Sequence, residues 1–146
     1  MARKLMPEEW MIPLVVKTNE GFFTSGRLVV QECGDCGNIQ HPPEEVCWRC
    51  LSMSLQWRDT SGKGTIYSYI VVHNPPAPSF KDVVPYAVVI VSLDDHPHVR
   101  VVGNVVNCPA REVRIGQRVR AVFDPIDPGD GGQTILLPQW EFIAAD

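Results

Sequence analysis

Four of the chain's five cysteines lie within one stretch of eighteen residues, CGDCGNIQHPPEEVCWRC. They form two Cys-x-x-Cys pairs, Cys33 with Cys36 and Cys47 with Cys50, separated by ten residues. Two residues between ligands allow a tight turn to direct both sulfurs at one ion, and two such turns supply the four thiolates of a closed tetrahedral zinc site. Gly37 follows the first pair, where such a turn favours a residue that adopts positive φ. The spacing therefore predicts a four-cysteine zinc ribbon.

Other chemistries also use paired cysteines. A thioredoxin-type dithiol would explain one pair, but it needs a βαβ context that the sequence lacks. Two disulfides would need an oxidising compartment, which nothing in the sequence indicates. A mononuclear iron site of rubredoxin type takes the same ligands, so the choice between zinc and iron stays open, with zinc favoured by the short connector. Four thiolates leave no open coordination position, which predicts a structural metal, and His41 in the Pro-rich connector is expected on the surface.

No pattern of catalytic residues stands out elsewhere. Cys108 is the only cysteine outside the ribbon, and a nucleophilic cysteine needs a base or a positive environment to form its thiolate. His73, His96 and His98 are present, but no spacing connects them with Cys108. The segment DDHPH (94–98) is typical of a turn rather than a metal loop. The sequence thus predicts a buried, unreactive Cys108 and no active site.

Two weaker features favour binding. The segment HNPPAPSFKDVV (73–84) is long for a loop between strands, and its prolines lower the entropy cost of docking. We interpret it as a binding loop rather than a tolerated insertion, with His73, Asn74, Phe80 and Lys81 as candidate contacts for a partner.

The second feature is a cluster of arginines. Its members are Arg100, Arg111, Arg114, Arg118 and Arg120. In QRVRAVF, strand alternation places Arg118 and Arg120 on one face, where they would bind phosphates. The alternative, a solvated face balanced by Glu112 and Asp124, stays equally open.

The elements that must position these residues are mostly strands. Segments rich in β-branched residues and bounded by Gly, Pro and Asp predict five strands at 64–72, 85–93, 99–106, 117–126 and 134–142. No helical pattern of 10–15 residues separates them, which favours a barrel or sandwich over βαβ units. Gly103 inside the third strand is expected at a bulge or barrel corner. Apolar residues on both faces of PYAVVIVSL predict a central strand covered on both sides. We therefore expect a mainly β chain with a five-stranded OB-fold barrel.

The chain divides into three expected parts: an N-terminal helical segment (1–30) with one or two short helices, a rubredoxin-like zinc ribbon (31–56) and the OB-fold domain (57–146). The formal net charge of -4 argues against binding through bulk positive charge, although a local basic patch remains compatible with it. No apolar run reaches the ~20 residues of a membrane-spanning helix, and the acidic start does not resemble a signal peptide. These observations predict a cytoplasmic protein.

The sequence resembles a family of zinc-ribbon/OB-fold proteins that accompany thiolase-like acyl-CoA enzymes and were long catalogued as a domain of unknown function. The resemblance runs from about residue 20 to the C-terminus. The matching segments, in the family's order and at its separations, are GRLVVQECGDCG, CWRC, SGKGTIYSYIVVH, PYAVVIVSLDD and VRIGQRVRAVFDP. Only the metal-ligand motif transfers residue by residue, onto Cys33, Cys36, Cys47 and Cys50, because the family shares no catalytic residues.

The resemblance implies a non-catalytic subunit with structural zinc, associated with a thiolase-fold partner and, in some complexes, a hydratase. In such an assembly the thiolase-fold chain holds the nucleophile, and the small subunit shapes or completes the site of the CoA thioester. The competing hypothesis is a single-stranded nucleic-acid-binding protein, in which Tyr67 and Tyr69 would stack bases. The negative net charge and the few lysines weigh against it.

Overall fold

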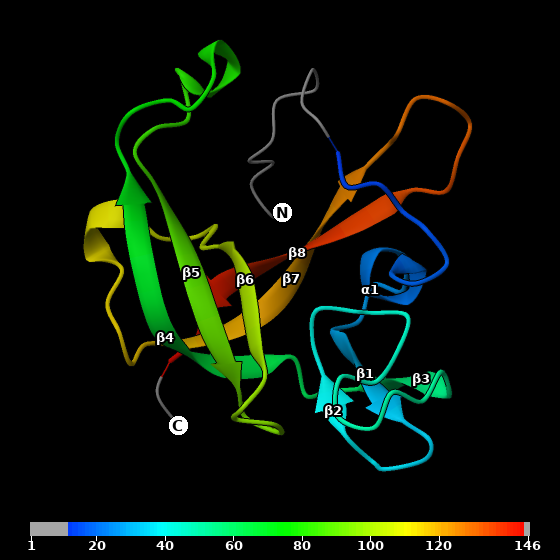
Figure 1. Ribbon diagram of the computed structural model, residues 1–146. Coiled ribbons are helices and arrows are strands. Elements are labelled where there is room, and N and C mark those ends of the chain that lie inside the picture. Colours follow the sequence, from blue (N-terminus) through cyan, green and yellow to red (C-terminus); the bar gives the residue numbers. More distant parts are fainter. Residues whose placement is uncertain (1–11, 145–146) are drawn as a thin grey trace.

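Two antiparallel sheets make up the part of the chain that the computed structural model describes, residues 12–144. Figure 1 shows the smaller sheet beside one end of the larger one. The helices are α1 (Glu20–Thr24) and the 3-10 helices η1 (Pro78–Phe80) and η2 (Ala110–Glu112). The strands are β1 (Val29–Cys33), β2 (Ile39–Gln40), β3 (Leu55–Asp59), β4 (Lys63–Val72), β5 (Tyr86–Leu93), β6 (Arg100–Asn104), β7 (Arg118–Ile126) and β8 (Ile135–Phe142).

The larger sheet contains the five strands predicted from the sequence, in the order β6-β5-β4-β7-β8. A bridge between Val105 and Trp140 brings the end of β6 to β8 and closes the barrel. The alternation along β5 is regular: every second side chain, from Ala87 to Leu93, is buried. The prediction of a mainly β chain with an OB-fold barrel is confirmed.

Gly103 does not lie at a bulge, which was one of the two positions predicted for it, the other being a barrel corner. The pairing of β5 with β6 runs through Gly103 without interruption, and the irregularity lies on β4, between Ile66 and Ser68. A Cβ atom at residue 103 would lie 2.8 Å from Cδ1 of Trp140, whose side chain is fully buried. Glycine is therefore needed here because the indole of Trp140 fills the space that a side chain would take.

The smaller sheet has the order β2-β1-β3 and carries the cysteines at its end. It begins at Val29 and reaches Asp59, so it extends beyond the predicted ribbon on both sides. Of the predicted N-terminal helices, α1 is the one seen between residues 12 and 30, and residues 1–11 lie outside the described part. Also within residues 12–144, no helix is long and apolar enough to cross a membrane.

The two sheets share one apolar core. Phe22 of α1, Val30 of β1 and Leu28, which directly precedes β1, belong to the same buried cluster as the inward side chains of the barrel. Hydrogen bonds from Thr60 to the Leu28 carbonyl, through both its N–H (3.1 Å) and its hydroxyl (2.7 Å), fasten the connection between the sheets. A change that unfolds the ribbon sheet will therefore also expose part of the barrel's core.

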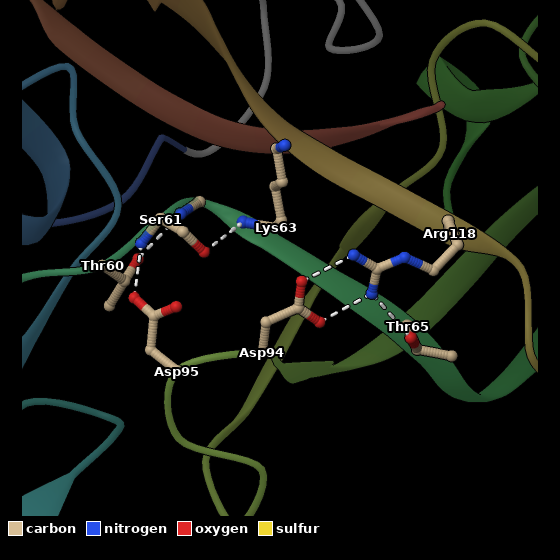
Figure 2. Close-up of polar contacts among 8 residues, drawn as sticks. Thr60, Ser61, Lys63, Thr65, Asp94, Asp95 and Arg118 are labelled. Atoms are coloured by element: carbon tan, nitrogen blue, oxygen red, sulfur yellow. Dashed lines mark hydrogen bonds and ion pairs between the residues drawn. The ribbon is translucent and has the colours of Figure 1, made fainter. Parts of the chain in front are cut away.

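Polar contacts fix the segment that joins β3 to β4 against the barrel (Figure 2). The backbone N–H of Ser61 donates to Asp95 at 2.6 Å. Arg118 of β7 forms a two-pronged ion pair with Asp94, with both N–O distances 2.6 Å, and also donates to the hydroxyl of Thr65 on β4 at 3.0 Å. Arg118 thereby connects β7, β4 and the turn after β5.

We expect Asp94→Asn to destabilise the chain by about 1 kcal/mol at pH 7, a modest effect because the Asp94–Arg118 pair is partly exposed. The hydrogen bond and charge of Arg118 hold the pKa of Asp94 below its usual value, so the pair contributes above the unfolded pKa of about 3.9 and is lost as pH falls through the lower folded pKa. Urea unfolding at pH 7 and pH 3 measures this. A gap between variant and parent that stays constant over this range would contradict the assignment.

Candidate metal centre and binding surfaces

The four cysteines of the two Cys-x-x-Cys pairs converge on one point. Their sulfur atoms all lie within 4.8 Å of one another. The Sγ atoms of Cys33 and Cys50 are 3.6 Å apart, and those of Cys36 and Cys47 are 3.7 Å apart. Zinc–sulfur bonds of about 2.3 Å in a tetrahedron require about 3.8 Å between sulfurs, whereas a disulfide needs about 2.0 Å. The residues fit one tetrahedral zinc ion.

Two similar backbone turns direct the sulfurs inward. The N–H of Gly37 donates to the Cys33 carbonyl at 2.9 Å, and the N–H of Leu51 donates to the Cys47 carbonyl at 2.8 Å. Both turns end in a left-handed residue, Gly37 at φ 73° and Leu51 at φ 64°. Glycine adopts this conformation freely, but leucine does so at a cost in free energy. The second turn therefore depends on the contacts that hold Cys47 and Cys50 together.

The ionisation of the cysteines also favours a bound cation. Burial raises the pKa of Cys47, but hydrogen bonds from the backbone N–H groups of Cys50 and Arg49 outweigh it and lower that pKa to about 6. A hydrogen bond from the backbone of Ser52 acts to lower the pKa of Cys50, yet burial and the neighbouring cysteines raise it to about 12. Without a metal, the cluster therefore does not hold four thiolates at neutral pH. A zinc ion would supply the missing positive charge.

Buried amides hold the loop between the two cysteine pairs. The side chain of Gln40 donates to the Gln31 carboxamide at 3.0 Å and to the Val46 carbonyl at 3.1 Å, while Gln31 also binds the backbone of Glu44. The amide of Asn38 approaches the Cys47 sulfur at 3.6 Å. The sequence did not indicate these contacts, because glutamine and asparagine side chains usually lie on the protein surface.

His41 lies apart from the cysteine cluster and differs from its predicted surface position. Its ring packs on that of Phe22, with 4.8 Å between the ring centres, and its Nδ1 atom is buried without a hydrogen-bond partner among the described residues. Burial lowers its pKa to about 4, so the ring is neutral at physiological pH. His41 connects the ribbon with α1.

The predicted binding loop projects from the end of the β4–β5 hairpin (Figure 1). His73, Asn74 and Lys81 are exposed there. Phe80 is half-buried, because its ring stacks on Tyr86 of β5 at 5.6 Å. Three of the four candidate side chains are thus available to a partner, and the fourth shapes the loop.

Both predicted phosphate-binding arginines have carboxylate partners within the chain. Arg118 pairs with Asp94, and Arg120 pairs with Glu141 of β8. These are not the acidic residues expected from the sequence, because cross-strand register and the turn after β5 decide which carboxylates come near. A phosphate at this position would have to compete with both carboxylates.

The two tyrosines of β4 do not form a stacking platform. Tyr69 packs against the core, and Tyr67 is on the surface with the guanidinium of Arg100 3.6 Å above the centre of its ring. The bulge between Ile66 and Ser68 accounts for this difference, since it breaks the alternation that would place both rings on one face.

Cys108 lies in the segment between β6 and η2, half-buried, with its sulfur 3.4 Å from the Pro109 carbonyl. Burial raises the pKa of its thiol, and Glu112 raises it further. The group is a neutral thiol at physiological pH, so it lacks the activation that a nucleophile needs.

A four-cysteine ribbon joined to a five-stranded barrel defines a zinc-ribbon/OB-fold protein. Residues 24–55 match the family model "ChsH2, rubredoxin-like zinc ribbon domain", and residues 57–124 match "ChsH2, C-terminal OB-fold domain". The chain belongs to this family, the DUF35 proteins, and its cofactor is structural zinc.

Three relatives illustrate the similarity. A "DUF35 domain-containing scaffold protein" of Methanocaldococcus jannaschii is 36% identical over 72% of this chain and 74% of its own length. A "Probable enoyl-CoA hydratase alpha subunit" of Thermomonospora curvata is 34% identical over 80% of this chain, which spans only 36% of that protein. The solved structure "Ltp2-ChsH2(DUF35) aldolase" contains a chain that is 32% identical, with a TM-score of 0.74, covering 90% of this chain and 98% of that one.

Proposed function

We propose that this chain is the non-catalytic subunit of an acyl-CoA enzyme complex, in which it shapes or completes the CoA-thioester site of a thiolase-fold partner. The observation that carries the proposal is the similarity to the DUF35 chain of the Ltp2–ChsH2 aldolase, because it extends over 98% of that chain. A hydratase is the second enzyme that the relatives' names support. The expected cytoplasmic location stays a prediction.

The chemistry of the described residues supports a non-catalytic role. The zinc site uses four thiolates and so offers no position for water or substrate. Cys108 is a neutral thiol without an activating base among its contacts in residues 12–144. The nucleophile of the reaction would therefore come from the partner chain.

The substrate contacts that we propose lie on two surfaces. His73, Asn74 and Lys81 on the projecting loop would meet the partner or the CoA portion of the substrate. Arg118 and Arg120 would reach a phosphate only by exchanging a carboxylate for it. We expect the loop to contribute more than the arginines, because its polar groups are exposed.

Co-expression tests this function. The full chain, produced together with a thiolase-fold chain encoded beside it, should co-purify with that chain as a stable complex. The isolated chain should show no turnover of an acyl-CoA thioester, whereas the complex should be active. A chain that elutes as a monomer from this co-expression, or that cleaves the thioester alone, would refute the proposal.

Binding of single-stranded nucleic acid is the weaker hypothesis. The structure offers one surface tyrosine on β4, and an arginine already covers its ring. Salt-dependent binding of an oligonucleotide at low ionic strength would revive this hypothesis.

A further inference from the structure

Part of the outer surface of strands β4, β5 and β6 is apolar. The side chains that alternate with the buried ones on these strands point away from the core, and the cross-strand register places them side by side: Ile70 beside Val88, and Ile90 beside Val102. We call this surface the outer apolar face; it consists of Ile70, Val72, Val88, Ile90 and Val102.

The same sheet looks different where β4 meets β7 and β8. There the outward side chains are Thr65, Arg118 and Arg120, and both arginines form ion pairs, that of Arg118 with Asp94 being shown in Figure 2. Water solvates such groups readily. Polar and apolar side chains thus occupy different parts of the outer surface of one sheet. Apolar residues scattered singly over a surface would not produce this separation.

The most protruding members of the outer apolar face are well exposed to solvent. Ile70 is 62% exposed and Val102 is 59% exposed, and Tyr67 at the border is 51% exposed. The sequence predicted that β5 would be covered on both sides, yet within residues 12–144 only its inward side chains are buried, and its outward ones are half-buried. Contiguous exposed apolar side chains on a soluble domain generally mark a site for another molecule.

The charges around the outer apolar face restrict what that molecule is. Strands β4, β5 and β6 contain two basic residues, Lys63 and Arg100, and no aspartate or glutamate, although the whole chain has a net charge of -4. Arg100 has no carboxylate within ion-pair distance among the described residues. The complementary surface is therefore apolar with carboxylates at its border.

A second copy of this chain does not meet that requirement. In a two-fold symmetric contact the same surface meets itself, so Arg100 would approach strands that offer no carboxylate. We propose that the outer apolar face is instead the docking surface for the catalytic, thiolase-fold chain of the complex, which presents an apolar patch bordered by acidic residues. This inference rests on the proposed function and adds the surface on which that function depends.

The position of the outer apolar face suits this role. Val72 pairs with Tyr86, on whose ring Phe80 stacks, so the apolar surface continues into the projecting loop. A partner seated on the strands would also contact His73 and Lys81. The loop and the face would then act as one interface, with the loop reaching toward the partner's substrate site.

Glutamate substitutions test the docking surface. Ile70→Glu and Val102→Glu, each in the full chain co-expressed with the thiolase-fold chain, are expected to weaken the complex about 30-fold or more, because a carboxylate would replace a central contact and face like charges. Leu14→Glu is the matched control, since Leu14 is 80% exposed and lies outside this sheet. It should bind like the parent. Affinities are measured by biolayer interferometry, with zinc content and thermal unfolding confirming that each variant is folded.

The outcomes separate this inference from the proposed function. If the parent chain binds the thiolase-fold chain and both glutamate variants bind equally well, the docking surface is wrong while the proposed function stands. If the parent chain does not bind, the proposed function is wrong, and the thiolase-fold chain is also excluded as the partner of the outer apolar face. If the isolated chain is a dimer that Ile70→Glu dissociates, a second copy occupies the face and the proposal is overturned.

Discussion

Replacing Cys47 by serine is expected to abolish zinc binding and to lower the thermal midpoint of unfolding by on the order of 10 °C or more. Cys47 is fully buried, and three other sulfurs lie within 4.8 Å of it. Structural zinc sites contribute about 10–16 kcal/mol of binding free energy to folding, and serine is a poor ligand for zinc. Because Val30 and Leu28 belong to the barrel's core, loss of the ribbon also weakens the barrel.

The measurement combines zinc content by mass spectrometry with thermal unfolding followed by circular dichroism. Cys108→Ser is the control, because Cys108 lies outside the cluster and should leave the zinc content at that of the parent. A Cys47→Ser protein that retains full zinc and the parent's thermal midpoint would show that the four sulfurs do not hold a structural ion.

Features of the sequence with strict spacing predicted this structure well. The two Cys-x-x-Cys pairs indicated the zinc ribbon because tetrahedral coordination allows few arrangements of four thiolates. The five barrel strands followed from their β-branched segments and turn residues, and each observed strand begins within one residue and ends within two residues of its prediction. Local geometry controls both features, so the local sequence contains the information.

Features that depend on distant parts of the chain were harder to predict. Which carboxylate faces Arg118 is decided by how the turn after β5 lies against β7, which gives Asp94 rather than a neighbour in sequence. The burial of His41 depends on α1 packing across the ribbon. Gly103 was interpreted as a bulge or a barrel corner because the sequence does not show that Trp140, thirty-seven residues later, fills the space above it.

The outer apolar face illustrates the same division. Apolar residues on both faces of β5 predicted a strand covered on both sides, and the structure buries its inward side chains fully but its outward ones only in part. The sequence did not show that, within residues 12–144, the outward side chains of β5 are left half-buried. The pattern of apolar residues in the sequence thus predicts that both faces of a strand are buried. The three-dimensional structure shows which face the described residues leave partly exposed.

Gly64→Ala is expected to destabilise the barrel by about 3 kcal/mol, at the upper end of what overpacking costs. Gly64 lies where β4 pairs with both β5 and β7, opposite Leu93 and Val119. A Cβ atom there would lie 2.4 Å from the backbone oxygen of Ser92 and 2.5 Å from Cγ1 of Val91. Neither neighbour can move, because Ser92 is held by the sheet and Val91 is fully buried.

The sign of this effect distinguishes packing from conformational preference. Strand propensity alone favours alanine over glycine by about 0.5–1 kcal/mol, so an open position would gain stability from the change. Gly132→Ala in the β7–β8 loop is the matched control, because its nearest neighbour is the flexible carboxylate of Asp130. Chemical unfolding in guanidinium compares the two variants. A Gly64→Ala chain as stable as the parent would mean that β4 and β5 do not approach as closely as the structure places them. The placement of the strands that form the outer apolar face would then also be wrong.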